Sequence, residues 1–201
     1  MNKPKIILDV IDTESASQAV EMISRLAEEN GVDWALVGGL AMNLYGSDRL
    51  TKDIDVIADK LLPIEHSQIV GKLKQGGERF NAETDKTVVS VDWIIRNDVF
   101  KSMFNEALKS AVRINEVPVL TPEWLVILKF IAGRFKDQED AVFLLSRNGL
   151  VNRKLIKTNI IKTAGEIAWE LAKHGYQRWY DLADGRSLEE QRNEKEGYID
   201  S

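Results

Sequence analysis

Two aspartates, Asp53 and Asp55, stand two positions apart in a short apolar run of the sequence. In an extended strand, alternate side chains point to the same face, so both carboxylates would share one face. Two such carboxylates can bind one divalent cation, or with a third carboxylate two cations about 3.5–4 Å apart. Asp92, the only acid in a later apolar run, is the obvious third ligand. These three aspartates are the predicted metal site.

A glycine pair, Gly38-Gly39, precedes the aspartates and follows another apolar run, residues 34–37. Glycines at a strand end leave backbone N–H groups free to approach a phosphate, and a following helix N-terminus adds a favourable field. Nucleotidyl transfer needs such a phosphate clamp, cations that bridge a triphosphate, and a carboxylate that orients or deprotonates an acceptor hydroxyl. Each motif alone is common in turns and caps. Their combination, with a strand on each side and in this order, favours a nucleotide and metal site.

The composition restricts which metal could bind. Among 201 residues there is no cysteine, which excludes disulfides, thiolate chemistry and cysteine-ligated zinc or iron–sulfur sites. The two histidines, His66 and His174, are far apart in the sequence, which leaves little room for a histidine-based site. Any metal would therefore be held by oxygen ligands, as Mg²⁺ or Mn²⁺ is.

Charge and hydropathy describe an ordinary soluble protein, with 44% hydrophobic and 29% charged residues. No signal peptide is recognisable, and the longest apolar helix candidate, residues 124–132, is too short to span a bilayer. We therefore expect a cytoplasmic location and no membrane partner. The net charge of −5 argues against a uniformly basic nucleic-acid binder but leaves local basic patches open.

Hydrophobic periodicity predicts an α+β fold in which an α/β core, residues 1–120, precedes a helical region, residues 121–184. A charged segment, residues 185–201, is expected to be mobile. The predicted helices cover residues 14–30, 40–45, a segment after Pro63, and residues 99–111, 121–135, 137–146 and 152–173. The predicted strands cover residues 34–37, 53–58, a segment around Phe80, residues 87–95, and two short runs within 112–120.

Lys129 is the only charge between Glu123 and Arg134 in an otherwise apolar helix. Burial of an ammonium group is costly unless the group meets an anion. That anion could be a nucleotide phosphate, or it could be the carboxylate of Asp137 or Asp140. The residue pattern leaves both alternatives open.

The glycine pair, followed by a short helix and the run Arg49-Leu50-Thr51-Lys52-Asp53-Ile54-Asp55, resembles the signature of the nucleotidyltransferase fold, the polymerase-beta-like superfamily. It is most similar to the AbiEii-type and minimal members. The resemblance implies a small mixed β-sheet with flanking helices and a C-terminal helical bundle. It also implies a site with these roles: Mg²⁺ or Mn²⁺ on Asp53, Asp55 and Asp92, and the nucleoside triphosphate at Gly38, Gly39, Arg49 and Thr51. Gly39 stands where other branches often carry serine, so no hydroxyl contact to phosphate is expected there.

The resemblance continues through Thr121-Pro122-Glu123-Trp124, Lys129, and the charged run that contains Arg134, Asp137 and Asp140. These residues look like the helical part of AbiEii-type proteins, in which a lysine in a buried helix follows the catalytic sheet. Lys129 is accordingly a candidate catalytic residue beside the three aspartates. The match covers roughly residues 30–150.

By resemblance, the reaction is transfer of a nucleoside monophosphate from a nucleoside triphosphate to an acceptor hydroxyl, with pyrophosphate leaving. AbiEii-type members are toxins of toxin–antitoxin or phage-defence systems, and some modify tRNA 3′ ends. A tRNA acceptor is therefore the first expectation, a protein hydroxyl the second and a small-molecule hydroxyl the third, with a cognate antitoxin as a candidate partner. A non-catalytic binding module with the same fold is the competing interpretation.

One segment bears on the acceptor. Between Arg147 and Gly165 there are five basic residues and no acidic one. This segment could approach the phosphates of an RNA end, or it could be an ordinary solvated helix face. The basic residues are Arg147, Arg153, Lys154, Lys157 and Lys162.

Overall fold

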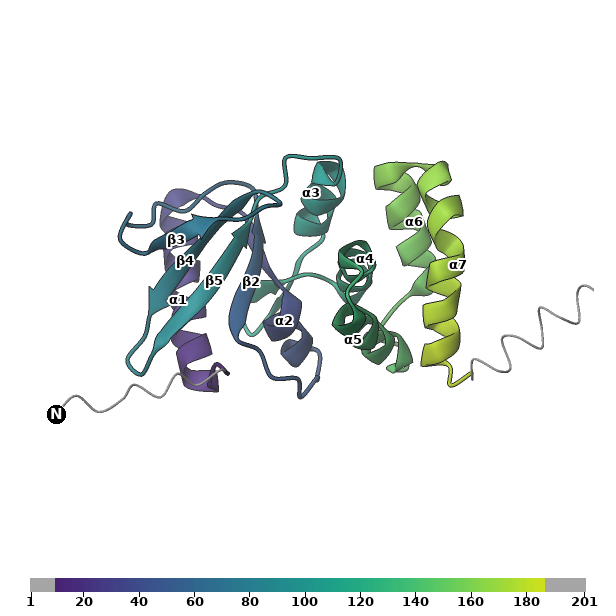
Figure 1. Ribbon diagram of the computed structural model, residues 1–201, viewed down its shortest axis with the longest axis horizontal. Helices are drawn as coiled ribbons and strands as arrows, with labels where there is room; N and C mark the ends of the chain where they lie inside the picture. The colour runs from purple at the N-terminus through teal and green to yellow at the C-terminus, as the bar shows by residue number, and fades with distance from the viewer. Residues whose placement is uncertain (1–9, 187–201) are drawn as a thin grey trace, which may run out of the picture. The chain divides into compact units, whose positions relative to one another are not determined.

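The computed structural model describes residues 10–186. The chain divides into two compact units, with the boundary between Thr121 and Pro122. Figure 1 shows that the first unit is a β-sheet with helices packed on it and that the second consists of helices alone. This mixed architecture confirms the predicted fold class.

The first unit is built on a seven-stranded mixed sheet with the order β3-β4-β5-β2-β1-β7-β6. Neighbouring strands are antiparallel, except that β1 runs parallel to β7 and β2 runs parallel to β5. The strands are β1 (Trp34–Val37), β2 (Asp53–Ala58), β3 (Ile69–Lys72), β4 (Gly77–Glu83), β5 (Val88–Ile94), β6 (Val112–Ile114) and β7 (Val117–Val119).

Three helices accompany the sheet: α1 (Thr13–Asn30), α2 (Gly38–Leu44) and α3 (Lys101–Lys109). Helix α1 packs on β4 and β5 and passes behind them in the view of Figure 1. The Asp12 side chain caps it by accepting hydrogen bonds from the N–H groups of Glu14 and Ser15, and Gly31 ends it in the left-handed conformation. Because α2 starts directly at the end of β1, the glycine pair lies where the strand becomes a helix.

One predicted helix is a strand in the structure. The segment after Pro63, predicted to be helical, forms turns and then β3, which pairs with β4 at the edge of the sheet. Ile69 and Val70 are β-branched and favour an extended strand. The free edge of β4 supplies hydrogen-bond partners that a local reading of the sequence does not reveal, such as the bond from the N–H of Asn81 to the Gln68 carbonyl.

The second unit contains α4 (Pro122–Ala132), α5 (Phe135–Ser146), α6 (Arg153–Ala164) and α7 (Glu166–Ala183). Helix α4 packs on α5 and α6, and α7 packs on α5 and α6. An aromatic cluster fastens α4 to α7: the ring of Phe130 stacks on Tyr176, with 4.1 Å between centroids, and meets the edge of Trp179.

The predicted single helix over residues 152–173 is two helices. Gly165 breaks it with a φ of 86° and a ψ of 169°, a conformation that is far from helical. Helix α7 then continues to Ala183, beyond the predicted end at residue 173, and includes Tyr176 and Trp179. Of the predicted charged tail, residues 187–201 lie outside the described part of the chain.

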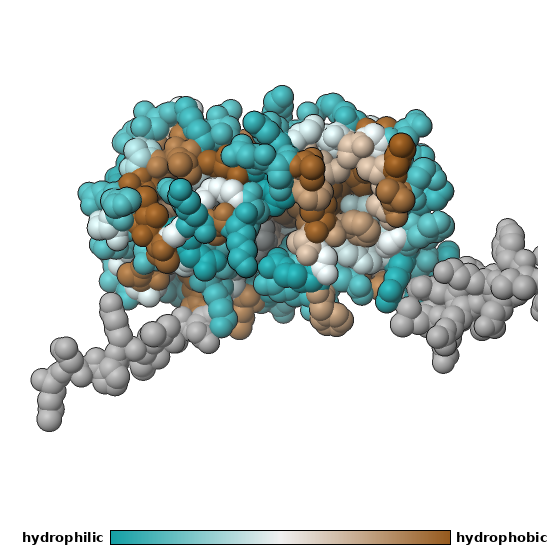
Figure 2. Space-filling view, turned by 45° about the horizontal axis from the view of Figure 1, so that its top comes forward, coloured by the Kyte–Doolittle hydropathy of each residue, from teal (hydrophilic) through white to brown (hydrophobic). Residues whose placement is uncertain are grey.

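Hydrophobic surface remains exposed on the helical unit, in the right-hand half of Figure 2. Among the described residues of this unit, the exposed large apolar side chains are Phe135, Leu155, Ile167 and Leu171. Within residues 10–186, none of the helices combines the length and the apolar character needed to cross a lipid bilayer.

Candidate metal and nucleotide site

The sheet register brings the three predicted aspartates together. Asp53 and Asp55 lie on β2 on one face, because one residue separates them. The parallel neighbour β5 places Asp92 directly opposite Asp55. One carboxylate oxygen from each of the three residues lies within 4.8 Å of the others. Asp53 and Asp55 are half-buried and Asp92 is buried. All three lie on strands, so the sheet itself forms the cluster.

Gly38 closes one side of this cluster. It has a φ of +63°, and a Cβ atom at this position would lie 1.9 Å from Oδ2 of Asp55. Val37 pairs with Asp55 across β1 and β2, which brings the start of α2 against the Asp55 carboxylate. The structure therefore requires glycine here for two reasons, the left-handed backbone and the absence of a side chain.

Gly39 makes a second close approach, to Thr51. A Cβ atom on Gly39 would lie 2.5 Å from Oγ1 of Thr51. That hydroxyl donates to the carbonyl of Asp53, with 2.9 Å between the oxygens, and Thr51 is buried. In this structure Thr51 thus supports the start of β2. Its predicted contact with the triphosphate stays a prediction.

The loop between α2 and β2 is held by Asn43, whose Nδ2 donates to the carbonyls of Ser47 and Arg49 at 2.8 and 2.7 Å. This loop contains Arg49, which is half-buried. The predicted role of Arg49 in binding the triphosphate also stays a prediction.

The structure adds one residue that the sequence did not identify. Arg79 lies on β4 directly opposite Asp92. Its Nε donates to Oδ1 of Asp92 at 2.5 Å and its Nη2 donates to Oδ2 at 2.7 Å. The hydrogen bonds to Asp92 raise the pKa of Arg79 against the opposing effect of partial burial, and the charges of Asp53 and Asp55 raise it further. The alternation of Arg79 and Asn81 with apolar Phe80 and Ala82 was a weak signal for this face of the strand.

The donor set of the cluster suits a hard divalent cation. All of its side-chain ligands are carboxylate oxygens, which Mg²⁺ and Mn²⁺ prefer. A guanidinium already rests on Asp92, which shows that the cluster attracts positive charge. The Asp53, Asp55 and Asp92 carboxylates would hold the ion, and the backbone at Gly38 is close enough to approach a phosphate bound to it.

Lys129 lies in the helical unit, where it is buried and forms ion pairs with two aspartates of α5. Its ammonium group bonds to Asp140 and lies 3.3 Å from Oδ1 of Asp137. Of the two alternatives that the sequence left open, the structure contains the ion pair between helices. A catalytic role for Lys129 stays a prediction.

Asp137 is the centre of this network and is fully buried. Arg134 donates to it through its backbone N–H at 3.2 Å and through its guanidinium Nε at 2.6 Å, which caps α5. Burial raises the pKa of Asp137, but hydrogen bonds from Arg134 and the charges of Lys129 and Arg134 outweigh burial and hold this pKa below its usual range. The charged run is therefore explained by local folding of the helical unit.

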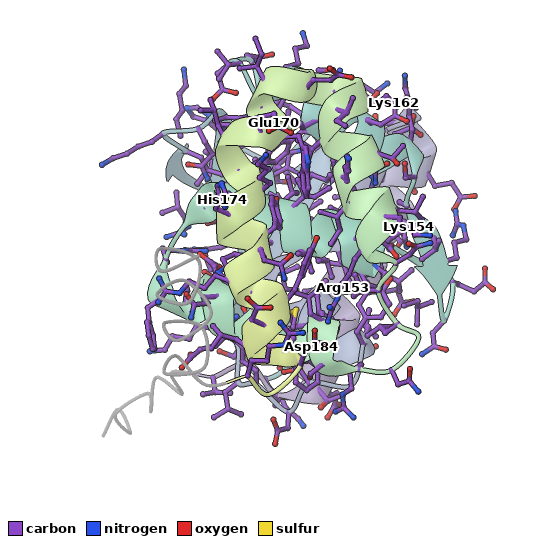
Figure 3. All side chains as sticks on the ribbon, turned by 90° about the vertical axis from the view of Figure 1, so that its right-hand side faces the viewer. Arg153, Lys154, Lys162, Glu170, His174 and Asp184 are labelled. Carbon is purple, nitrogen blue, oxygen red and sulfur yellow. The ribbon has the colours of Figure 1, made fainter. Side chains whose placement is uncertain are left out.

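The basic residues between Arg147 and Gly165 are partly engaged within the same unit. Arg153 forms a two-pronged ion pair with Asp184, at 2.9 and 2.5 Å, which can be followed in Figure 3. The Lys157 ammonium lies 5.8 Å from the ring centroid of Trp169. Lys154 and Lys162 project from α6, and the neighbouring α7 carries Glu170 in the same view. The surface is mixed in charge.

Comparison with known proteins identifies solved structures with a similar fold. No protein-family model matches the chain, and no curated protein matches it either. Among solved structures, a candidate nucleotidyltransferase from Helicobacter pylori has a TM-score of 0.50 at 13% identity, over 92% of this chain and 98% of that one. JHP933 from Helicobacter pylori has a TM-score of 0.50 at 13% identity, over 94% of this chain and 97% of that one. An antigenic nucleotidyltransferase-like protein from Paracoccidioides brasiliensis has a TM-score of 0.46 at 15% identity, over 81% of this chain and 94% of that one. The chain has the fold of nucleotidyltransferase-like proteins.

Proposed function

We propose that the protein is a nucleotidyltransferase that moves a nucleoside monophosphate from a nucleoside triphosphate to an acceptor hydroxyl. The observation that supports this most strongly is the sheet register, which joins Asp53 and Asp55 on β2 to Asp92 on β5. Gly38, whose missing side chain leaves room beside Asp55, supports a close approach by phosphate. The shared fold is consistent with this chemistry.

Each part of the site has a distinct role in the proposal. Asp53, Asp55 and Asp92 would hold Mg²⁺, or Mn²⁺, which when bound would supply positive charge to neutralise the charge that develops on the triphosphate. Backbone N–H groups at Gly38 and Gly39 bind phosphate oxygens. Asp92 orients the acceptor hydroxyl and accepts its proton, and pyrophosphate carries away the bonding electron pair of the α–β linkage.

For the acceptor we propose RNA, with a tRNA end first. The motif around Asp53 and Asp55 resembles AbiEii-type proteins, some of which act on tRNA, and the basic side chains of α6 offer contacts for phosphates. As part of the same proposal, the protein acts in the cytoplasm as a member of a toxin–antitoxin or phage-defence pair.

The test uses each of the four nucleoside triphosphates, labelled at the α-phosphate, with Mg²⁺ and either total RNA or lysate protein. We expect label in RNA with the wild type and loss of that label with Asp53→Asn, which keeps the shape of the side chain but removes a ligand charge. Asp59→Asn is the matched control, since Asp59 follows the opposite end of β2 and its carboxylate accepts the N–H of Asp33 at 3.0 Å.

The outcomes separate the alternatives. Label in protein but not RNA would replace the proposed acceptor and leave the enzyme class intact. Label in neither, together with no binding of triphosphate or Mg²⁺ in calorimetry, would refute the enzyme and favour a non-catalytic module. Equal labelling by Asp53→Asn and Asp59→Asn would refute the assigned site.

A further inference from the structure

We propose that Arg79 is an exchangeable counter-ion: it holds Asp92 while no divalent cation is bound, and on cation loading its guanidinium moves to the triphosphate of the nucleotide. This inference rests on the proposed function, because it assigns a step to the same cation and nucleotide. It goes beyond that function by assigning a role to Arg79, which lies on β4, whereas the three aspartates lie on β2 and β5.

The first step of the argument is that Arg79 and a cation compete for the same group. The guanidinium of Arg79 meets both oxygens of Asp92, at 2.5 and 2.7 Å, in the two-pronged geometry that guanidinium and carboxylate favour. One oxygen of Asp92 also belongs to the cluster within 4.8 Å of Asp53 and Asp55. A divalent cation at this cluster would lie next to a fixed positive charge, so its binding is opposed as long as Arg79 stays.

The second step is that Arg79 is the partner able to move. The Arg79 side chain is 43% exposed, whereas the Asp92 side chain is 12% exposed. Asp92 lies on β5 in the middle of the sheet, between β2 and β4. Rotation of the long Arg79 side chain toward solvent requires no repacking of the core, whereas displacement of Asp92 would disturb the strand. Exchange therefore proceeds through Arg79.

The third step concerns what the released guanidinium meets. It is planar, permanently charged and carries N–H donors in a fork that matches phosphate oxygens. Once the carboxylates are occupied by cations, the nearest new negative charge in the proposed reaction is the triphosphate. The guanidinium of Arg79 thus exchanges the Asp92 carboxylate for the triphosphate. Binding of the cation thereby makes the guanidinium available to the nucleotide.

The direct test is NMR of the arginine Nε–H group. In protein free of divalent cations, the Nε–H signal of Arg79, assigned by its loss in Arg79→Gln, should show the slow exchange and downfield position of a short hydrogen bond to carboxylate. Saturation with Mg²⁺ alone should shift this signal toward that of a solvated arginine. An unchanged signal at saturating Mg²⁺ would overturn the proposal.

Calorimetry with Mg²⁺ alone gives a second readout. Arg79→Gln should bind Mg²⁺ roughly two- to fivefold more tightly than wild type, which corresponds to about 0.4–1 kcal/mol and lies within the usual range for an exposed ion pair. Arg153→Gln breaks a similar two-pronged pair, with Asp184, and serves as the control with unchanged Mg²⁺ affinity. Equal affinities of wild type and Arg79→Gln would contradict the exchange. Arg79→Met, which also removes the charge, is the substitute variant with the same expected gain if Arg79→Gln does not fold.

A double-mutant cycle separates exchange from a general effect of charge. With EDTA present and inorganic triphosphate as the probe, Asp92→Asn should bind triphosphate more tightly than wild type because Arg79 is released. Arg79→Gln combined with Asp92→Asn should lose this gain. A gain that persists in the double variant would assign it to the removed negative charge alone and would overturn the proposal.

These results are distinguishable from failure of the proposed function. Nucleotidyl transfer together with an unchanged Arg79 signal would remove the counter-ion and keep the enzyme. No binding of Mg²⁺ or triphosphate to wild type, together with no transfer of label, would overturn both.

Discussion

Replacement of Gly38 by alanine tests how closely the glycine pair and the proposed metal site depend on each other. The backbone of Gly38 has a φ of +63°, and a Cβ atom there would lie 1.9 Å from Oδ2, 2.6 Å from Cγ and 2.8 Å from Cβ of Asp55. Contacts below 3.0 Å are essentially never seen for real Cβ atoms. Either the start of α2 or the Asp55 side chain must move by roughly 1 Å, a displacement that can lower catalysis about 100-fold.

Two costs must be separated in this variant. An alanine in the left-handed region costs about 1–2 kcal/mol wherever it occurs. Gly46 provides the matched control, since its φ is +87° and nothing lies within 4 Å of a Cβ atom at that position. Gly46→Ala should therefore show the backbone cost alone, whereas Gly38→Ala should show the backbone cost and the collision with Asp55.

The assays are urea unfolding, Mg²⁺ calorimetry and transfer of labelled nucleotide. We expect both variants to lose about 1–2 kcal/mol of unfolding free energy from the backbone. Only Gly38→Ala should lose Mg²⁺ affinity, by at least about tenfold, together with transfer activity. If Gly38→Ala binds Mg²⁺ as tightly as Gly46→Ala does, the metal ion does not depend on the position of Asp55, and the reasoning is refuted.

Two predictions concern the helical unit. Lys129→Met should lower the unfolding free energy by about 3–5 kcal/mol, measured with urea at neutral pH, because it leaves the buried Asp137 and Asp140 without their shared cation. Unchanged stability combined with lost transfer activity would instead indicate a catalytic lysine. The pKa of Asp137 is held below its unfolded value of about 3.9, so its stabilising contribution is present above that pH and is lost as the pH falls through the folded pKa. The stability difference between wild type and Asp137→Asn should therefore shrink below about pH 4, and a difference that stays the same well below about pH 4 as at pH 7 would contradict this.

Local chemistry explains why much of the site could be predicted from the sequence. Asp53 and Asp55 share a face because strand side chains alternate, and this holds whatever the strand pairs with. The glycine pair marks the change from β1 to α2 because no other residue type tolerates the Gly38 backbone beside Asp55. Asp92 was noticeable as the single acid in an apolar run, because burial of a carboxylate is costly unless it binds a cation or a hydrogen-bond donor.

Elements that depend on partners elsewhere in the chain could not be read in this way. Residues 69–72 form a strand because the edge of β4 is available to them, a contact with no local signal. The Gly165 break was visible as a glycine, but a glycine within a helical pattern is compatible with a continuous helix as well. At residues 69–72, pairing with β4 decided the conformation.

The sequence by itself determined the chemistry available to this protein, since the types and spacing of Gly38, Asp53 and Asp55 are local properties. Only the tertiary structure decided which charges meet. The register of β5 between β2 and β4 set Asp92 against Asp55 on one side and Arg79 on the other. Packing of α4 on α5 gave Lys129 its carboxylate partners. Electrostatic pairing acts over a few ångströms between residues far apart in the chain, so it follows from the fold.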